Sequence, residues 1–185
     1  MTPRIILDLC GGTGAWSEPY RQAGYDVRLV TLPEQDVRLY VPPERVHGVL
    51  AAPPCTYFCR MRMCRGRPTD VQFAEGLSVV DACLRIIWRT QPQWWALENP
   101  QGYLHRWLGR PRFKFHPADF GDAWTKRTWL WGNFTTPLPL FTGILPTVPV
   151  RQWVDDGTND GLSHGAESNA TTPAGFARAF FTANL

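Results

Sequence analysis

The sequence has no run of apolar residues long enough to cross a membrane, and we expect no secretory signal at its amino terminus, because Asp8 and the glycines follow at once. We therefore expect a cytoplasmic protein without a membrane partner. No internal repeat is visible. A hydrophobic content of 44% excludes extended disorder, and 185 residues suit a single catalytic domain, 1–185, with a full α/β core.

The sequence also lacks the cysteine pattern of a secreted or zinc-binding domain. Its five cysteines are an odd number, and without a secretion signal they are expected to be thiols rather than disulfides. Cys55, Cys59 and Cys64 lie close together, but no second cluster completes four zinc ligands at usual spacing. We therefore predict no metal site.

A strong excess of positive charge is missing as well, because the net charge is only +3. The distribution is less even than the total, since four cations and no acid occupy residues 60–67: Arg60, Arg62, Arg65 and Arg67. Such a run is usually a solvated loop. Beside a candidate nucleophile, a loop that contacts phosphates is at least as good an interpretation.

Cys55 is that candidate. The apolar run 46–51 predicts a buried strand, and Pro53 and Pro54 end it, since proline removes backbone donors and fixes φ. Cys55 is thereby held just beyond the carboxyl end of the strand, where open parallel sheets bind their ligands.

The chain begins with the pattern of a nucleotide-binding unit. A strand over 4–9 leads into a glycine turn, 10–14, and a helix over 15–23. The glycine spacing is not G-x-G-x-x-G, so the NAD fingerprint is excluded. A second strand is predicted over 26–30, and a short third strand over 37–41.

The acid that usually ends the second strand is absent. Thr31 occupies that position and is followed by Leu32 and a proline. The next acid, Glu34, comes three residues after the position where the acid is expected. Asp36 could approach an adenine amino group, or it could be an ordinary acid of a surface turn.

A second strand end carries the other half of a possible site. A helix is predicted over 70–90 and a buried strand over 94–97, which stops at Glu98, Asn99 and Pro100. Glu98 would then lie beside Cys55. The alternative is that Glu98 caps a helix starting near Gln101.

The remaining chain completes the sheet. A short helix and basic turn are expected over 102–112, and the aromatic residues of 113–120 are expected to pack. A cationic turn at 125–127 enters a strand that ends at 132–133, and 135–161 has the composition of a surface loop. Thr172 is predicted to cap a last helix, with inward residues Phe176, Ala177, Phe180 and Phe181.

Three of these segments, in this order, resemble motifs of the DNA cytosine-5 methyltransferases: 8–14, 52–55 and 97–100. Residues 126–128 with 131–133 look like the later arginine motif of that family. Asn169, with Thr172 and Pro173, resembles the segment that closes its cofactor pocket. The resemblance implies a Rossmann-like S-adenosylmethionine-dependent fold, α/β, with a mostly parallel sheet and helices on both faces.

The resemblance also implies roles. Cys55 would attack C6 of a flipped cytosine in DNA, Glu98 would hydrogen-bond N3, and Asn99 would hold Glu98 or the strand end. Arg127 and the loop cations would lower the pKa of the Cys55 thiol. Implied substrate contacts are Pro54, Arg60, Arg62, Arg65 and Lys126. Implied contacts to S-adenosylmethionine are Asp8, Cys10, Gly11, Gly12, Gly14, Trp16, Thr31, Leu32, Asp36, Pro53 and Asn169.

The chain departs from the family where a target-recognition domain is expected. Only about thirty loop-like residues, 135–168, are available there, and Thr31 replaces the usual acid. The leading hypothesis is a compact cytosine-5 methyltransferase of phage or mobile-element type. The alternative is an enzyme that modifies C5 of single-stranded DNA or of a pyrimidine nucleotide, or that transfers a different group to C5. A non-catalytic module that binds nucleic acid or a nucleotide is a third hypothesis.

Overall fold

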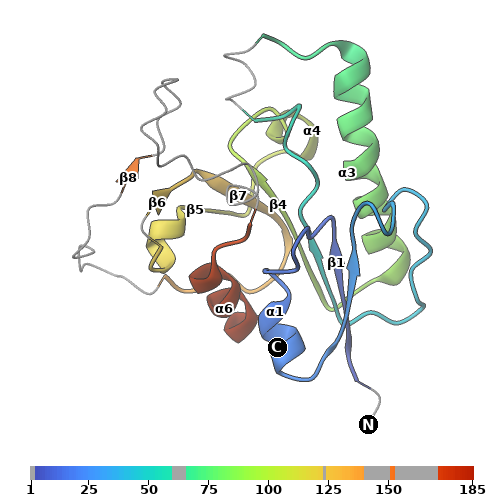
Figure 1. Ribbon diagram of the computed structural model, residues 1–185, viewed down its shortest axis with the longest axis vertical. Helices are drawn as coiled ribbons and strands as arrows, with labels where there is room; N and C mark the ends of the chain where they lie inside the picture. The colour runs from blue at the N-terminus through green and yellow to red at the C-terminus, as the bar shows by residue number, and fades with distance from the viewer. Residues whose placement is uncertain (1–2, 60–65, 123, 140–150, 153–170) are drawn as a thin grey trace.

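A mixed six-stranded sheet forms the centre of the computed structural model, which describes residues 3–59, 66–122, 124–139, 151–152 and 171–185 (Figure 1). The strand order is β2-β1-β3-β4-β7-β5. The strands are β1 (Ile5–Leu9), β2 (Asp26–Val30), β3 (Gly48–Ala51), β4 (Trp94–Pro100), β5 (Phe113–Phe115) and β7 (Thr128–Asn133). The first four strands in that order run parallel, whereas β7 is antiparallel to both β4 and β5. The sheet is therefore mixed, but β7 is the one strand of the six that runs against the others, which agrees with the mostly parallel sheet that we expected.

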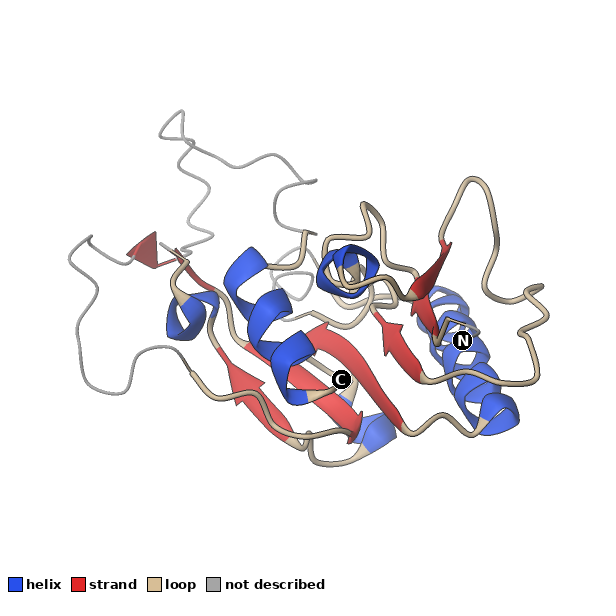
Figure 2. Ribbon diagram, turned by 90° about the horizontal axis from the view of Figure 1, so that it is seen from below, coloured by secondary structure: helices blue, strands red, loops and turns tan. Residues whose placement is uncertain are grey.

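Helices cover both faces of the sheet (Figure 2). The helices are α1 (Glu18–Gln22), α3 (Asp70–Thr90), α4 (His105–Leu108), the 3₁₀ helix η1 (Pro117–Phe120) and α6 (Ala174–Ala183). Helices α1 and α6 lie on one face and α3 on the other. A separate ribbon pairs β6 (Trp124–Thr125) with β8 (Arg151–Gln152). No helix among the described residues combines the length and apolarity that a membrane crossing needs.

Strand side chains alternate between two cores, one on each face. Leu7, Val49 and Leu97 belong to the cluster under α3, whereas their neighbours Ile6, Leu50 and Ala96 join the aromatic cluster under α1 and α6. A strand projects successive side chains to opposite faces, so apolar runs such as those of β1 and β3 supply both cores at once.

Helix α3 spans 70–90, as the periodicity predicted. The Thr69 hydroxyl accepts the Gln72 amide, and the Gln72 side chain accepts the Thr69 amide, which together form a capping box. The helix ends at Gln91 in the left-handed conformation. Local signals were therefore sufficient to set both ends.

Several expected boundaries were wrong. The predicted helix over 15–23 is helical only over 18–22, because 12–17 are turns, and the predicted strand over 37–41 forms turns and extended chain. The short helix expected within 102–112 is α4, 105–108. At the carboxyl end, Thr172 is not the cap, because Pro173 holds that position and α6 has no side-chain cap. Phe181 is only partly buried.

Strand β4 is longer than predicted, and the difference matters for the site. Its parallel pairing with β3 ends at Leu97, but its antiparallel pairing with β7 continues to Pro100. Glu98 and Asn99 are therefore strand residues paired on one side only. The alternative that Glu98 caps a helix near Gln101 is excluded, since α4 begins at His105.

Candidate active site

Three parallel strands end together at one edge of the sheet. Leu9 pairs with Ala51, and Ala51 pairs with Leu97, so the residues that follow emerge side by side. This edge carries the glycine turn after β1, the proline turn after β3 and the end of β4 beyond Leu97, which pairs with β7 but not with β3. The topology thus brings the two halves of the predicted site to the same place.

The nucleophile candidate lies at the start of a helical turn. The Cys55 carbonyl accepts the amides of Phe58 at 2.9 Å and Cys59 at 3.0 Å, and the Phe58 side chain is fully buried. Since residues four apart in such a turn lie on one face, the Cys55 and Cys59 thiols are neighbours, and they share a hydrogen bond.

Asn99 fixes the proline turn that leads to Cys55. Its side chain is fully buried, and its amide nitrogen donates to the Pro53 carbonyl oxygen at 2.9 Å. The bond joins β4 to the turn after β3. Asn99 therefore positions the turn of the nucleophile, and its described bond is made to Pro53 rather than to Glu98.

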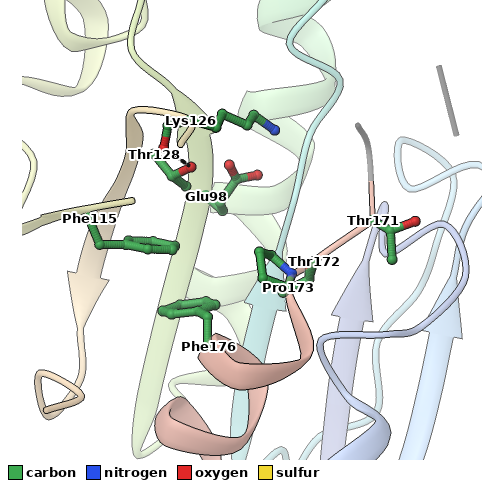
Figure 3. A pocket seen from close by; sticks show the side chains of 8 residues that line it. All are labelled: Glu98, Phe115, Lys126, Thr128, Thr171, Thr172, Pro173 and Phe176. Atoms are coloured by element: carbon green, nitrogen blue, oxygen red, sulfur yellow. Dashed lines mark hydrogen bonds between the residues drawn. The ribbon is translucent and has the colours of Figure 1, made fainter. Parts of the chain in front are cut away.

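Glu98 and Lys126 line one small cavity (Figure 3). Its volume is about 20 Å³, which is room for about one water molecule. A pyrimidine ring is larger than this, so a base could enter only if lining side chains moved. Burial raises the pKa of Glu98, and the Lys126 ammonium acts in the opposite direction. A larger fraction of Glu98 is therefore protonated near neutral pH than in a solvated carboxyl.

The electrostatics of Cys55 contradict our expectation of a lowered pKa. The hydrogen bond with Cys59 and burial raise the pKa of the Cys55 thiol, and the negative charge of Glu98 adds to this, whereas Lys126 alone lowers it. Cys55 is consequently a protonated thiol in the free protein. A thiolate would need a base or a further cation once substrate is present.

Arg127 is not the cation that lowers the pKa of Cys55. Its side chain is exposed and donates to the Gln101 side-chain oxygen at 3.1 Å, while its carbonyl accepts the Gln101 amide at 2.8 Å. Lys126, which we had placed among the substrate contacts, is the cation whose charge acts on Cys55 and Glu98.

The glycine turn after β1 is built over a buried acid. Asp8 is fully buried and accepts a hydrogen bond from the Ser17 hydroxyl, and burial raises its pKa to about 6. A Cβ on Gly11 would lie 2.2 Å from the Asp8 carboxylate, so only glycine fits there. Gly12 and Gly14 have φ of +55° and +74°, which favour glycine.

Cys10 begins the same turn at a φ of +58°, and its amide donates to the Val30 carbonyl at 2.7 Å. Its thiol shares a hydrogen bond with the buried Cys83 thiol of α3, which lowers the pKa of Cys10. This bond ties the turn to α3.

The residues after β2 differ in their availability for a ligand. Leu32 is 66% exposed, and Thr31 is partly buried. The Asp36 carboxylate is paired with the Arg38 guanidinium, as an acid of a surface turn would be. Trp16 lies in the aromatic core against Phe176 and Phe180 with 1% exposure, and its contact with the cofactor stays a prediction.

The glycine turn after β1 and the buried Asp8 fit a nucleoside-bearing cofactor, whereas the residues after β2 fit it less well. Small residues with positive φ let the backbone approach a ligand at the edge of the sheet. The buried Asp8 Oδ1 has no hydrogen-bond partner among the described residues, so it can still accept a bond. An acid for the ribose hydroxyls is missing at Thr31, and Asp36 would first have to release Arg38.

Some predicted site residues lie outside the described residues: Arg60, Arg62, Arg65 and Asn169. Most of 135–168, where a recognition domain was expected, lies outside them too. Pro54 is exposed beside Cys55, and Pro53 is buried. Within the described part of the chain, no three metal-ligating side chains lie together.

The cavity also has lining residues that the sequence analysis assigned to packing or did not consider, namely Phe115, Thr171 and Phe176. Thr128, Thr172 and Pro173, which also line it, belong to segments that the family resemblance had already named. The Phe115 and Phe176 rings stack with centroids 4.1 Å apart, which places the start of α6 against β5 (Figure 3). Phe115 and Phe176 come from two segments about sixty residues apart, so no spacing in the sequence could have grouped them.

Comparisons with known proteins identify the fold. No protein-family model matches the sequence, and no curated protein matches it. The structure is similar to the crystal structure of a protein named as a DNA modification methyltransferase encoded within a prophage of E. coli, with a TM-score of 0.53 and 16% identity. The match covers 70% of this chain and 46% of the other, so this chain spans less than half of that protein's length. At this identity the likeness establishes a shared α/β fold.

Proposed function

We propose that this chain is a DNA cytosine-5 methyltransferase that uses S-adenosylmethionine. One observation carries the proposal: the fold brings a thiol, a partly buried carboxyl and an ammonium, from the segments after β3, in β4 and before β7, to one edge of the sheet. The structural neighbour, named as a DNA modification methyltransferase, supports the same class of reaction.

The chemistry assigns one role to each group. The Cys55 thiolate adds to C6 of cytosine, and the electron pair of the C5=C6 bond moves to C5, which becomes nucleophilic. This addition is favoured when N3 is hydrogen-bonded by an acid, and burial, which raises the pKa of Glu98, favours the protonated carboxyl that such a bond needs. Once C5 carries the methyl group, its proton passes to water, the electron pair of the C5–H bond re-forms the C5=C6 double bond, and the bond between C6 and the Cys55 sulfur breaks to release the thiolate.

The remaining residues position these groups. Asn99 holds the proline turn, and Lys126 supplies positive charge as the thiolate forms. The glycine turn with Asp8, together with Thr31 and Leu32, would hold S-adenosylmethionine. When bound, that cofactor supplies an electrophilic methyl group for C5.

The test is a covalent adduct with DNA that contains 5-fluorocytosine, in the presence of labelled S-adenosylmethionine. We expect an adduct that is stable to denaturation with the wild type, none with Cys55→Ala, and an adduct with the matched control Cys59→Ala. Absence of an adduct in the wild type, or its persistence in Cys55→Ala, would refute the proposal.

Glu98→Gln tests the second group. It should lower turnover by about 10²- to 10⁴-fold, which is typical for loss of a general acid, while DNA affinity changes little. Equal losses of turnover and affinity would contradict the N3 role. Replacement of duplex DNA by single-stranded DNA or dCMP in the same assay identifies the substrate.

A further inference from the structure

A second cationic segment lies close to the site. Residues 99–118 contain four cations and no acid: Arg106, Arg110, Arg112 and Lys114. The described part of this segment forms α4, β5 and the connection between them. An acid-free run of this kind supplies charge for an anionic partner, and its structure decides where that charge lies.

The segment is anchored directly to the turn that carries Cys55. The Tyr103 amide donates to the Phe58 carbonyl at 2.7 Å, and Gly102 forms a bridge with Cys59. A Cβ on Gly102 would lie 1.9 Å from the Phe58 oxygen, so the two backbones are in contact. Helix α4 is thus held at the same end of the sheet as the candidate nucleophile (Figure 1).

Burial sets the orientation of α4. Leu104 is fully buried and Leu108 packs against the core, which places one side of the short helix inward. The intervening residues His105, Arg106 and Trp107 are exposed, and Trp107 keeps 55% of its surface accessible.

Aromatic and cationic side chains alternate on this side. The Arg106 guanidinium lies over the Tyr103 ring at 5.1 Å. The Trp129 ring is contacted by Lys114 Nζ at 5.2 Å and by His105 at 5.7 Å between ring centroids. We define the α4 surface by its outward residues: Tyr103, His105, Arg106, Trp107, Arg110 and Lys114.

Exposed indoles and cations in combination suit single-stranded nucleic acid, because unpaired bases stack on aromatic rings while arginines contact the phosphates. Trp88 on α3 is 79% exposed as well, but its groove includes Asp81, and the neighbouring Arg85 donates to backbone carbonyls of 37, 38 and 40. Among the tryptophans whose burial the structure describes, Trp107 of the α4 surface is the one that joins high exposure to an acid-free segment.

We propose that the α4 surface binds the single-stranded stretch of DNA next to the target cytosine, with a base stacked on Trp107 and phosphates on Arg106 and Arg110. This inference rests on the proposed function, since it names the form of DNA that reaches Cys55. The α4 surface also lies outside the short region between β7 and α6, where a target-recognition domain was expected. It would therefore supply substrate contacts from another part of the chain.

The experiment measures the affinity of the full chain for a fluorescent single-stranded oligonucleotide by anisotropy, at several salt concentrations. Trp107→Ala should weaken binding by about 5- to 150-fold, as expected for loss of one stacked base. Arg106→Gln combined with Arg110→Gln should reduce the slope of log K against log salt by about 1.4, or about 0.7 for each phosphate contact. The matched controls are Trp88→Ala and Arg89→Gln on α3, which should leave both quantities unchanged.

Three outcomes would overturn the inference: Trp107→Ala binds like Trp88→Ala, its loss of affinity appears only with duplex DNA, or the salt slope of the double variant equals that of the wild type. The 5-fluorocytosine adduct separates this inference from the proposed function. An adduct in the wild type without a Trp107 effect refutes the surface alone. A Trp107 effect without any adduct refutes the methyltransferase alone and leaves the surface as a DNA-binding site.

Discussion

Asp8 should make the stability of this protein fall as the pH rises through the acidic range. Its carboxyl is fully buried, and burial raises its pKa from 3.8 to about 6, although the Ser17 hydroxyl donates to it. The folded state therefore binds the proton more tightly than the unfolded chain does. The contribution of Asp8 to the free energy of unfolding is fully present below pH 3.8 and is lost as the pH rises through about 6. At higher pH this contribution no longer changes.

The size of the effect follows from the two pKa values. They differ by about 2, and 1.36 kcal/mol for each pH unit gives about 3 kcal/mol in total. Most of this, about 2 kcal/mol, should be lost between pH 4 and pH 7. Asp8→Asn removes the titrating group at nearly the same shape, so the variant should not show this loss.

Urea unfolding of both proteins at pH 4, 5, 6 and 7 measures the difference. Because other groups titrate in the same range, the quantity to compare is the pH-dependent change in the wild type minus that in the variant. Glu34→Gln replaces an exposed acid at the same edge of the sheet and should follow the wild-type curve. If wild type and Asp8→Asn give parallel curves, the carboxyl is not buried as described.

Two further predictions concern the turn of the nucleophile. Asn99→Ala leaves the buried Pro53 carbonyl without its donor, so the free energy of unfolding should fall by about 1–3 kcal/mol in urea unfolding; a value within experimental error of zero would mean that the bond is not made. Cys59→Ala removes the thiol that raises the pKa of Cys55, so alkylation of Cys55 by iodoacetamide at pH 8, followed by mass spectrometry, should be several times faster than in the wild type. An unchanged rate would show that burial alone keeps Cys55 protonated.

Local sequence patterns predicted secondary structure correctly where the signals lie within the segment itself. Helix α3 has its predicted ends because a capping box and an apolar stripe act within the segment itself. The predicted strand over 37–41 failed because its sequence has no sheet partner in the fold, and Val37 is buried from a turn instead. A β-rich run becomes a strand only when another strand offers its backbone groups.

Some features of the candidate site were likewise predictable from local sequence, and others depended on tertiary contacts. The proline turn and the acid after the fifth predicted strand were recognisable, because the two strand ends are adjacent in any parallel arrangement of β3 and β4. The extension of β4 to Pro100 depends on β7, which lies about thirty residues further along the chain. The sequence also could not distinguish Lys126 from Arg127, since neighbouring side chains diverge and only packing decides which one lines the cavity.

By itself, the sequence determined the α/β class, the glycine turn over Asp8, the helix of 70–90 and the pairing of Cys55 with Glu98 at one edge of a sheet. These features follow from local periodicity and from backbone constraints of glycine and proline. Only the tertiary structure decided the reversed direction of β7 in the sheet, the burial of Trp16 and the direction of the Cys55 pKa shift. The strand pairing and the burial of Trp16 depend on segments far away in the chain, whereas the pKa of Cys55 is raised first by Cys59, four residues away, and then by burial. Local sequence does not encode which of these groups come into contact.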